Sequence, residues 1–338
     1  GVFPARNPDL SQSTHYIMGL ASTLLFFVCL LAHELSHSVV ANAKGVPVEG
    51  ITLFIFGGMA HTRMEAEEPG DELAIAGIGP VASIALAGLF GVIAWLGSRV
   101  NWHPAVVDPA RYLAWINLIL AGFNLLPGFP LDGGRLFRAV AWKATGDVTK
   151  ATRWAAKGGQ ILGWILMGLG ALQLLGGNPV GGLWLIFIGW FLRTAAEASF
   201  RQHMIQTIFQ GIPAREVMTA DPVTVSARLV LKDLVEEKFL RGRFQCYPVV
   251  DDDSGDVVGL VTLEQVKDVD RGQWEEIRVQ DVMTPREDVE VAPEDPMTDV
   301  IQKMRDKDRR VLVTRDGELL GVISAGDVSR WVQLEQDL

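Results

Sequence analysis

Four long stretches of this chain contain no charged residue, and they cover residues 16–32, 73–98, 112–131 and 158–192. A helix needs about 20 mostly apolar residues to cross roughly 30 Å of hydrocarbon. The first stretch continues beyond a short polar motif, and the last is divided by Gly-Gly-Asn-Pro-Val-Gly-Gly, which predicts a turn. The pattern therefore predicts five membrane helices, at 14–43, 72–98, 111–128, 157–176 and 181–200.

The segment between the first two predicted spans, 46–60, has a different pattern. Its run Ile-Thr-Leu-Phe-Ile-Phe at 51–56 is β-branched and aromatic, and glycines flank it, which predicts a strand or short hairpin at membrane depth. Non-helical backbone is tolerated there only where protein or a water-filled cavity satisfies it, so we expect a cavity nearby. The strand could bind an extended peptide along its edge, or its role could be purely structural.

The last third of the chain contains an internal repeat. Glu-Val-Met-Thr at 216–219 returns as Asp-Val-Met-Thr at 281–284, and Val-Val-Gly-Leu-Val-Thr at 257–262 resembles Leu-Leu-Gly-Val-Ile-Ser at 319–324. Two similar α+β units should therefore pack as a pseudo-symmetric pair. The predicted fold is a polytopic α-helical membrane domain over 1–205, with a short membrane-embedded β segment, followed by a soluble α+β pair.

Composition and charge support this division into two environments. Hydrophobic residues make up 49% of the 338 residues, which places part of the chain in lipid. Residues 1–211 carry 13 Lys and Arg against 12 Asp and Glu, whereas 212–338 carry 17 against 28, so the net charge of −10 arises in the last third. That acidic part argues against nucleic acid as a partner. Cys29 and Cys246 lack CxxC spacing and are expected to be ordinary buried cysteines.

Basic residues in the connecting segments predict the orientation, because they are enriched on the cytoplasmic side of a membrane. If the first helix ends inside, the outer basic residues are Arg6, Arg99 and Arg111. The inner ones are Lys44, Arg63, Arg135, Arg138, Lys143, Lys150, Arg153 and Lys157, with Arg193 and Arg201 near the last exit. We therefore expect a plasma-membrane protein whose C-terminal pair lies in the cytoplasm.

The polar motif in the first span is His-Glu-Leu-Ser-His at 33–37. On a helix it places the imidazoles of His33 and His37 one turn apart, where both can bind one zinc ion, and it places Glu34 beside the metal-bound water as a general base. The alternative is a polar helix end without metal. Ionisable residues are costly inside a membrane helix and are functional by default, so the zinc site is favoured.

A catalytic zinc ion has three protein ligands and one open position for water, so a third ligand is needed. His103 lies in an outer loop, on the wrong side of the membrane. Asp71 begins a helix after several acidic residues, where a carboxylate is commonplace. Asp132 follows Pro130 at the inner end of a span, at the level expected for the histidines, and is the strongest candidate. His61 follows two glycines and stays open as a cavity-lining or zinc-contacting residue.

Three motifs together resemble the site-2 protease family of intramembrane zinc proteases, peptidase family M50. They are His-Glu-Leu-Ser-His, Gly-Ile-Gly-Pro at 77–80, and Asn-Leu-Leu-Pro-Gly-Phe-Pro-Leu-Asp-Gly-Gly at 124–134, and the resemblance covers residues 16–200. That family usually has one more membrane helix before the first motif, which implies that the chain lacks its start.

The resemblance implies one Zn(2+) ion per chain, bound by His33, His37 and Asp132. It implies that Glu34 activates water and that Asn124 holds the substrate carbonyl. The implied activity is that of a zinc metalloendopeptidase acting in or near transmembrane segments. Its substrates would be membrane-anchored proteins such as anti-sigma-type regulators, as in regulated intramembrane proteolysis.

The repeated pair resembles tandem CBS domains, also called a Bateman module, over 212–272 and 277–336. In that family a motif ending in Ser/Thr-x-x-Asp binds the ribose of adenine nucleotides. The second copy matches at Ser324 and Asp327, whereas the first has Gln265 in place of the Asp. The resemblance implies one site for ATP, ADP or AMP and a homodimer formed through the pair, and the alternative is a dimerisation module without ligand.

Two rival functions stay open at this point. CBS pairs also occur beneath membrane transport proteins, so the chain could be a CBS-regulated transporter or channel. A transport path would need ionisable or broken-helix positions on several spans, whereas the polar residues here gather at 33–37 and Asp132. The other rival is a zinc-binding regulator without catalysis, which the intact Glu34 disfavours.

Overall fold

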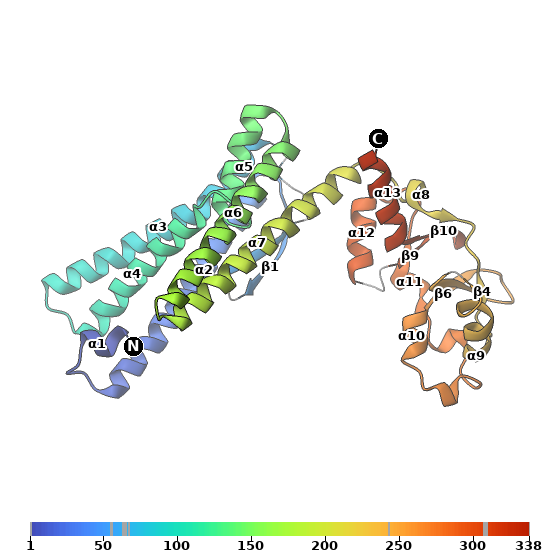
Figure 1. Ribbon diagram of the computed structural model, residues 1–338, viewed down its shortest axis with the longest axis horizontal. Coiled ribbons are helices and arrows are strands. Elements are labelled where there is room, and N and C mark those ends of the chain that lie inside the picture. The colour runs from blue at the N-terminus through green and yellow to red at the C-terminus, as the bar shows by residue number, and fades with distance from the viewer. Residues whose placement is uncertain are drawn as a thin grey trace. The chain divides into compact units, whose positions relative to one another are not determined.

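The computed structural model describes residues 2–54, 57–62, 66, 68–242, 244–306 and 310–337. The chain divides into two compact units, Gly1–His203 and Met204–Leu338, and Figure 1 labels most of their helices and several of their strands. Ile55, Phe56 and Arg63, on which predictions above depend in part, lie outside the described residues.

The first unit contains long helices and one β hairpin. Its helices are α1 (Val2–Arg6), α2 (Gln12–Ala43), α3 (Pro69–Arg99), α4 (Pro104–Asn124), α5 (Asp132–Thr145), α6 (Val148–Leu175) and α7 (Pro179–Ile208). By length and composition, α2, α3, α6 and α7 can each cross a membrane. The span predicted at 111–128 corresponds to α4, which begins earlier and includes the buried Asp108.

Local sequence explains where several of these helices begin and end. The Ser11 hydroxyl caps α2 by accepting a hydrogen bond from Thr14 N over 3.2 Å. Asp147 caps α6 in the same way, accepting from Lys150 N over 2.9 Å, and this bond lowers the pKa of the Asp147 carboxyl. Gly146 ends α5 in the left-handed region, with φ 72°.

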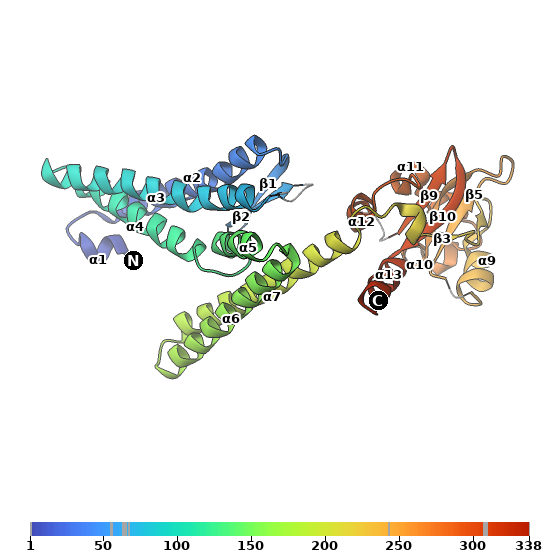
Figure 2. The same ribbon diagram turned by 90° about the horizontal axis from the view of Figure 1, so that it is seen from above.

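Helix α3 packs along α2, α4 and α5, and Figure 2 shows α3 and α2 side by side in this arrangement. Side chains on the outward faces of α2 and α3 are apolar and exposed, as expected for lipid contact. They include Leu24, Val28, Ile84, Leu89 and Val92. Because it packs against three other helices, α3 is the central element of this unit.

The predicted β segment is an antiparallel hairpin of β1 (Val48–Phe54) and β2 (Gly57–Thr62). Its backbone pairs Phe54 with Gly57 and Gly50 with His61. The hairpin packs against α2, and Asn42 Oδ1 at the end of α2 accepts a hydrogen bond from Val48 N over 3.1 Å. Extended backbone thus lies beside the helix that carries the first motif.

Helices α6 and α7 form an antiparallel hairpin in which glycines allow close approach. A Cβ atom on Gly163 would lie 2.6 Å from Gly189 O, and one on Gly170 would lie 2.6 Å from Gly182 O. Small residues at such positions let membrane helices pack backbone against backbone. The turn between them falls at 176–178, within the predicted Gly-rich run.

The second unit contains two four-stranded sheets. One has the order β3 (Thr219–Ala220), β10 (Glu318–Ser324), β9 (Arg310–Arg315), β8 (Glu290–Val291). The other has the order β4 (Val225–Ser226), β5 (Cys246–Val250), β6 (Val257–Thr262), β7 (Thr284–Pro285). The helices are α8 (Ala214–Val217), α9 (Leu231–Asp233), α10 (Leu263–Lys267), α11 (Arg286–Val289), α12 (Met297–Asp306) and α13 (Ala325–Asp337), with a π-helical segment at Leu234–Phe239 and two 3₁₀ segments at Arg271–Gln273 and Val279–Asp281.

The two copies of the repeat exchange their first strands. Strand β3 of the first copy pairs with β10 of the second, and β7 of the second copy pairs with β6 of the first. A small apolar core joins the copies, and it consists of Val257, Leu260, Val289, Leu312 and Val322. Cys246 packs against that core, and burial raises the pKa of its thiol, so the thiol stays protonated near neutral pH.

Candidate metal centre

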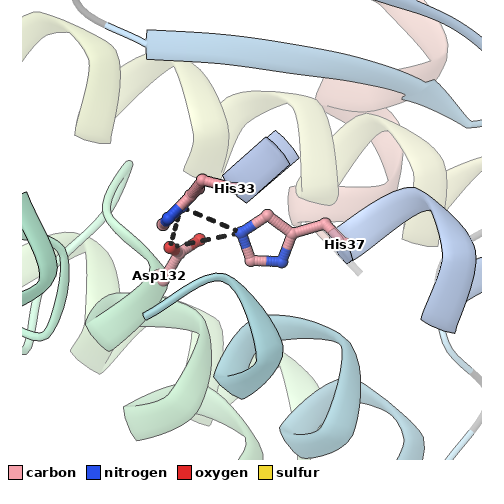
Figure 3. A group of neighbouring side chains, drawn as sticks. All are labelled: His33, His37 and Asp132. Atoms are coloured by element: carbon pink, nitrogen blue, oxygen red, sulfur yellow. Dashed lines mark hydrogen bonds and ion pairs between the residues drawn. The ribbon is translucent and has the colours of Figure 1, made fainter. Parts of the chain in front are cut away.

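Two buried imidazoles face each other on α2. His33 and His37 are 2% and 7% exposed, and their Nε2 atoms lie 3.3 Å apart. The spacing of four residues places both rings on one side of the helix, one turn apart. Figure 3 shows the two rings converging on a carboxylate from another element.

That carboxylate belongs to Asp132, the first residue of α5. Its Oδ2 atom lies 3.2 Å from His33 Nε2 and 3.3 Å from His37 Nε2. The three ligand atoms all lie within 4.8 Å of one another. The structure therefore brings together the three residues that the sequence marked as candidate ligands.

The outer nitrogen of each imidazole has a partner on α3. His37 Nδ1 lies 2.6 Å from Ile75 O, and since a carbonyl oxygen only accepts, the ring donates from Nδ1. This tautomer leaves the Nε2 lone pair of His37 facing Asp132. His33 Nδ1 lies 2.8 Å from the hydroxyl of Ser83. Partners of this kind orient metal-binding histidines in other proteins.

The donor set fits zinc. Two imidazole nitrogens and one carboxylate oxygen are ordinary zinc ligands, and a catalytic site leaves the fourth position to water or substrate. Ligands placed tetrahedrally at about 2.0 Å from zinc lie about 3.3 Å from one another, close to the 3.2 and 3.3 Å between these atoms. The distances between the three donor atoms are thus those expected if all three bind one zinc ion.

Gly79 of α3 lies against the same group of atoms. A Cβ atom on this residue would lie 2.7 Å from His33 Nε2 and would overlap the ring of His37. Any larger residue would therefore push into the space between the donors. The roles of Gly79, Ser83 and the carbonyl of Ile75 were not predicted, and the Gly-Ile-Gly-Pro motif was the one sign that could have indicated them.

The loop that leads into Asp132 is compact because glycines remove steric overlap. A Cβ atom on Gly133 would overlap the backbone of Leu125, and one on Gly134 would overlap that of Gly128. The loop also packs on α6, where Phe129 N donates to Ala155 O over 3.2 Å. Helix α6 therefore supports the loop from outside.

Replacement of Gly159 in α6 by Ala should destabilise this loop. The new Cβ would overlap Phe129 O and would lie 3.0 Å from the Cβ atom of Ala196, and because neither neighbour is the flexible end of a side chain, a loss of about 1–3 kcal/mol in unfolding free energy is expected. Thermal unfolding and zinc content of the purified protein measure the effect. Gly168→Ala in the same helix is the matched control, since its Cβ meets nothing within 4 Å. Equal stability of the two variants would contradict this packing.

The other predicted ligand candidates are placed elsewhere. The His103 ring caps α4, where Nδ1 accepts from Ala105 N over 3.2 Å. Asp71 forms an ion pair of 2.8 Å with Lys44. The backbone of His61 lies in β2, and its side chain is outside what the structure describes.

The two remaining predicted active-site residues are half-buried. Glu34 lies on α2 directly after His33, and Asn124 is the last residue of α4. Within the described part of the chain, no hydrogen bond joins Asn124 to the three donors. Both positions are compatible with side chains that act on a bound substrate.

The predicted nucleotide-binding Asp327 is engaged inside the second unit. Its Oδ2 accepts from Ser324 N over 2.9 Å and from Ser324 Oγ over 2.6 Å, which caps α13. Its Oδ1 accepts from Thr219 Oγ1 over 2.8 Å and from Arg330 over 2.5 Å. A ribose hydroxyl would have to join or displace these donors.

Gln265 has the equivalent position in the first copy. Its Oε1 accepts from Thr262 N over 2.7 Å, which caps α10, and its Nε2 donates to Thr284 Oγ1 over 2.6 Å. Thr219 and Thr284 are the last residues of the two Val-Met-Thr repeats. Gln therefore preserves the internal hydrogen bonds that Asp makes in the second copy, and sequence comparison of the copies did not reveal this.

Comparisons with known proteins show the family to which this chain belongs. The model of peptidase family M50 matches residues 21–107 and 97–166, and the CBS domain model matches 214–272 and 279–334. Rip3 of Mycobacterium tuberculosis, named as a zinc metalloprotease, is 37% identical over 323 residues, which cover 95% of this chain and 82% of that one. The zinc metalloprotease MJ0392 of Methanocaldococcus jannaschii is 32% identical over 322 residues, with 95% and 87% covered.

A solved site-2 protease from Methanocaldococcus jannaschii is also similar, with 30% identity, a TM-score of 0.42, and 59% of this chain and 82% of that chain covered. The predicted family and fold class are confirmed, and the relatives do not favour a transporter or channel. The chain therefore belongs to the site-2 protease family of multi-pass membrane zinc metalloproteases, peptidase family M50, and carries a C-terminal CBS pair.

Proposed function

We propose that this protein cuts membrane-anchored proteins, such as anti-sigma-type regulators, with one zinc ion held by His33, His37 and Asp132. The observation that carries the proposal is the convergence of these three donors from α2 and α5, spaced at 3.2–3.3 Å. The donors lie in a unit whose helices α2 and α3 are long and apolar enough to cross a membrane. Peptide bonds in or near transmembrane segments can thus reach the metal.

Glu34 acts as the general base in this scheme. His33, His37 and Asp132 would hold the zinc ion, which would polarise the scissile carbonyl and lower the pKa of a water molecule to about 7. The Glu34 carboxylate, which directly follows His33 on α2, accepts the proton of the attacking water and returns it to the leaving amine. Asn124 at the end of α4 donates a hydrogen bond to the carbonyl oxygen of the substrate.

The β hairpin supplies a place for an extended substrate. A helix hides its peptide bonds in internal hydrogen bonds, so the scissile stretch must unwind before it is cut. In the described part of the chain, β1 and β2 form a sheet of two strands, so each strand is paired along one edge only. A peptide can therefore add as a third strand along an unpaired edge. The hairpin packs on α2, which carries both histidines.

The CBS pair lies in the cytoplasm of a plasma-membrane protein under this proposal. The support is the distribution of basic residues, since α5 and the segments around it carry Arg135, Lys143 and Lys150 at the end where α2 finishes. The pair forms a homodimer, and its second copy binds an adenine nucleotide at Ser324 and Asp327. Binding then alters cleavage only if the nucleotide favours one state of the enzyme over another.

Asp327→Ala should weaken binding of ATP, ADP and AMP by about 10–100-fold, because a charged acceptor of a ribose hydroxyl contributes roughly 1.5–3 kcal/mol. Calorimetry on the full chain measures the affinity. Gln265→Ala is the control, since it removes the equivalent cap in the first copy. Unchanged nucleotide affinity in Asp327→Ala would exclude Asp327 from the nucleotide site, whereas absence of nucleotide binding by the wild type would assign the pair to dimerisation alone.

The test of the proposed protease uses the full chain in lipid vesicles with a membrane-anchored substrate. We expect about one zinc per chain, loss of cleavage on chelation and recovery on adding zinc. Asp132→Asn should bind zinc more than about 100-fold more weakly, since loss of a direct ligand exceeds the cost of losing an outer partner. Cleavage that survives complete removal of zinc would contradict the proposal.

A further inference from the structure

A charged residue outside the metal centre is fully buried in the first unit. Glu72 lies in the first turn of α3, and its exposed fraction is 0%. It precedes Gly79 by two helical turns, so it lies on the face of α3 that approaches the imidazoles. Charged residues are almost never so buried unless they are paired.

The partner of Glu72 is Arg138 of α5. Arg138 Nε donates to Glu72 Oε1 over 2.6 Å, and Arg138 Nη2 contacts the same oxygen. Arg138 is itself buried, with 7% exposed. Arg135, one turn earlier, places its Nε 3.9 Å from that oxygen. The ion pair therefore joins the first turn of α3 to the middle of α5.

Arg138 also contacts the loop on the other side of Asp132. Its guanidinium carbon lies 5.5 Å from the centroid of the Phe129 ring, within the range of a cation–π interaction. Phe129 precedes Asp132 in the chain, and Arg138 follows it. The buried guanidinium of Arg138 thus holds in place both the loop that precedes Asp132 and the helix that begins at Asp132.

Stability alone is a weak explanation for the Glu72–Arg138 pair. The desolvation of two buried charges offsets much of their attraction, and apolar replacements of such pairs are often neutral or stabilising. In addition, Glu72 Oε2 is buried without a hydrogen-bond partner in the described part of the chain, which costs further free energy. A guanidinium–carboxylate contact is directional, however, and fixes how two helices lie against each other.

Helix α3 is also the element that holds the imidazoles. Ile75 O binds His37 Nδ1, and Ser83 Oγ binds His33 Nδ1. The two ligands on α2 are therefore held in a fixed position relative to α3. The third ligand must also be held in a fixed position relative to α3 if all three are to meet at one point.

We propose that Glu72 and Arg138 are positioning residues that hold Asp132 at zinc-binding distance from the two imidazoles. The proposal rests on the proposed function, because it takes Asp132 as a zinc ligand. Loss of the ion pair frees the start of α5 to move relative to α3, and a ligand displaced by a fraction of an ångström binds zinc more weakly. Outer partners of metal ligands contribute about 10–100-fold in metal affinity.

The experiment measures zinc affinity of the full-length protein in detergent by competition with a chelator. Glu72→Gln removes the charge of the carboxylate and should reduce zinc affinity by about 10–100-fold. Asp71→Asn is the matched control, because the neighbouring Asp71 pairs with the exposed Lys44; it should leave zinc affinity unchanged. Cleavage by Glu72→Gln should recover when zinc is raised to saturation, since the chemistry of the centre is intact.

Arg138→Lys is the milder variant. Lysine keeps the buried charge but loses the fork of the guanidinium, so a smaller loss of zinc affinity is expected. If Glu72→Gln does not fold, Arg138→Lys decides alone: reduced affinity supports the proposal and wild-type affinity overturns it. A lower unfolding temperature of the zinc-free protein with unchanged zinc affinity also overturns it, because the pair would then be structural only.

Failure of this inference differs from failure of the proposed function. If the wild type binds no zinc, the metal centre itself is wrong, and with it the assignment of Asp132. If the wild type binds zinc and the Glu72 and Arg138 variants bind it equally tightly, only the positioning role is overturned.

Discussion

Glu34→Gln should abolish cleavage while the protein keeps its zinc. Gln has the shape of Glu but cannot accept a proton at neutral pH, and loss of a general base costs about 10²–10⁴-fold in rate. Glu34 is absent from the three-donor group, so zinc content should stay at the wild-type level. Cleavage of a reconstituted membrane-anchored substrate and metal analysis of the same samples measure both quantities.

The control for this prediction is Glu197→Gln. Glu197 is also a carboxylate on a long apolar helix, α7, where it pairs with Arg193 over 3.3 Å at a partly exposed position. Its replacement should change neither zinc content nor cleavage. Undiminished cleavage by Glu34→Gln would exclude Glu34 as the base, whereas simultaneous loss of zinc would point to a role in metal binding.

Gly79→Ala should prevent zinc binding. The added methyl group would lie 2.7 Å from His33 Nε2 and would overlap the His37 ring, so at least one imidazole must leave its place. Helix α3 cannot shift to relieve the overlap without breaking its bonds to both rings. We expect zinc affinity to fall by more than about 100-fold, beyond the cost of losing one outer partner, and cleavage to fall with it.

Gly77→Ala is the matched control, two residues away on the same helix. Its new Cβ would meet Leu136 Cδ2 at 3.7 Å, an ordinary van der Waals contact. This variant should bind zinc and cleave substrate as the wild type does, and thermal unfolding should show both variants to be folded. Wild-type zinc affinity in Gly79→Ala would mean that the donors are arranged differently from Figure 3.

The three donors could be chosen from the sequence for simple physical reasons. Helical periodicity places His33 and His37 on one side of α2, and the proline-containing run before Asp132 indicates the end of a span at a similar depth. These signals are local, and each can be recognised without knowledge of the tertiary structure. The fold class was predictable from the apolar stretches and the internal repeat, whereas the family was predicted from the resemblance of three motifs to a known family.

The residues around the donors could not be predicted, because their roles depend on how helices cross. A backbone carbonyl such as that of Ile75 has no side-chain signal at all. Arg138 was counted only as an inner basic residue when the orientation was derived, yet the structure buries it against Glu72. Charge counts treat residues as independent, and pairing between α3 and α5 is a property of packing.

The repeat pattern also could not predict the strand exchange in the second unit. Similarity between the copies predicts two alike units, but it does not say which strand completes which sheet. Strands β3 and β7 are only two residues long, too short for periodicity to reveal them. The matching roles of Asp327 and Gln265 emerge only after the exchange is known.

Because β3 and β7 each complete the sheet of the other copy, neither copy folds as a closed unit alone. A chain that ended after the first copy would leave an edge of β6 open and β3 without a sheet, and open edges invite pairing with other molecules. Truncation or recombination between the copies would therefore produce aggregating fragments. The pair is therefore the smallest segment of this module whose removal leaves no sheet incomplete.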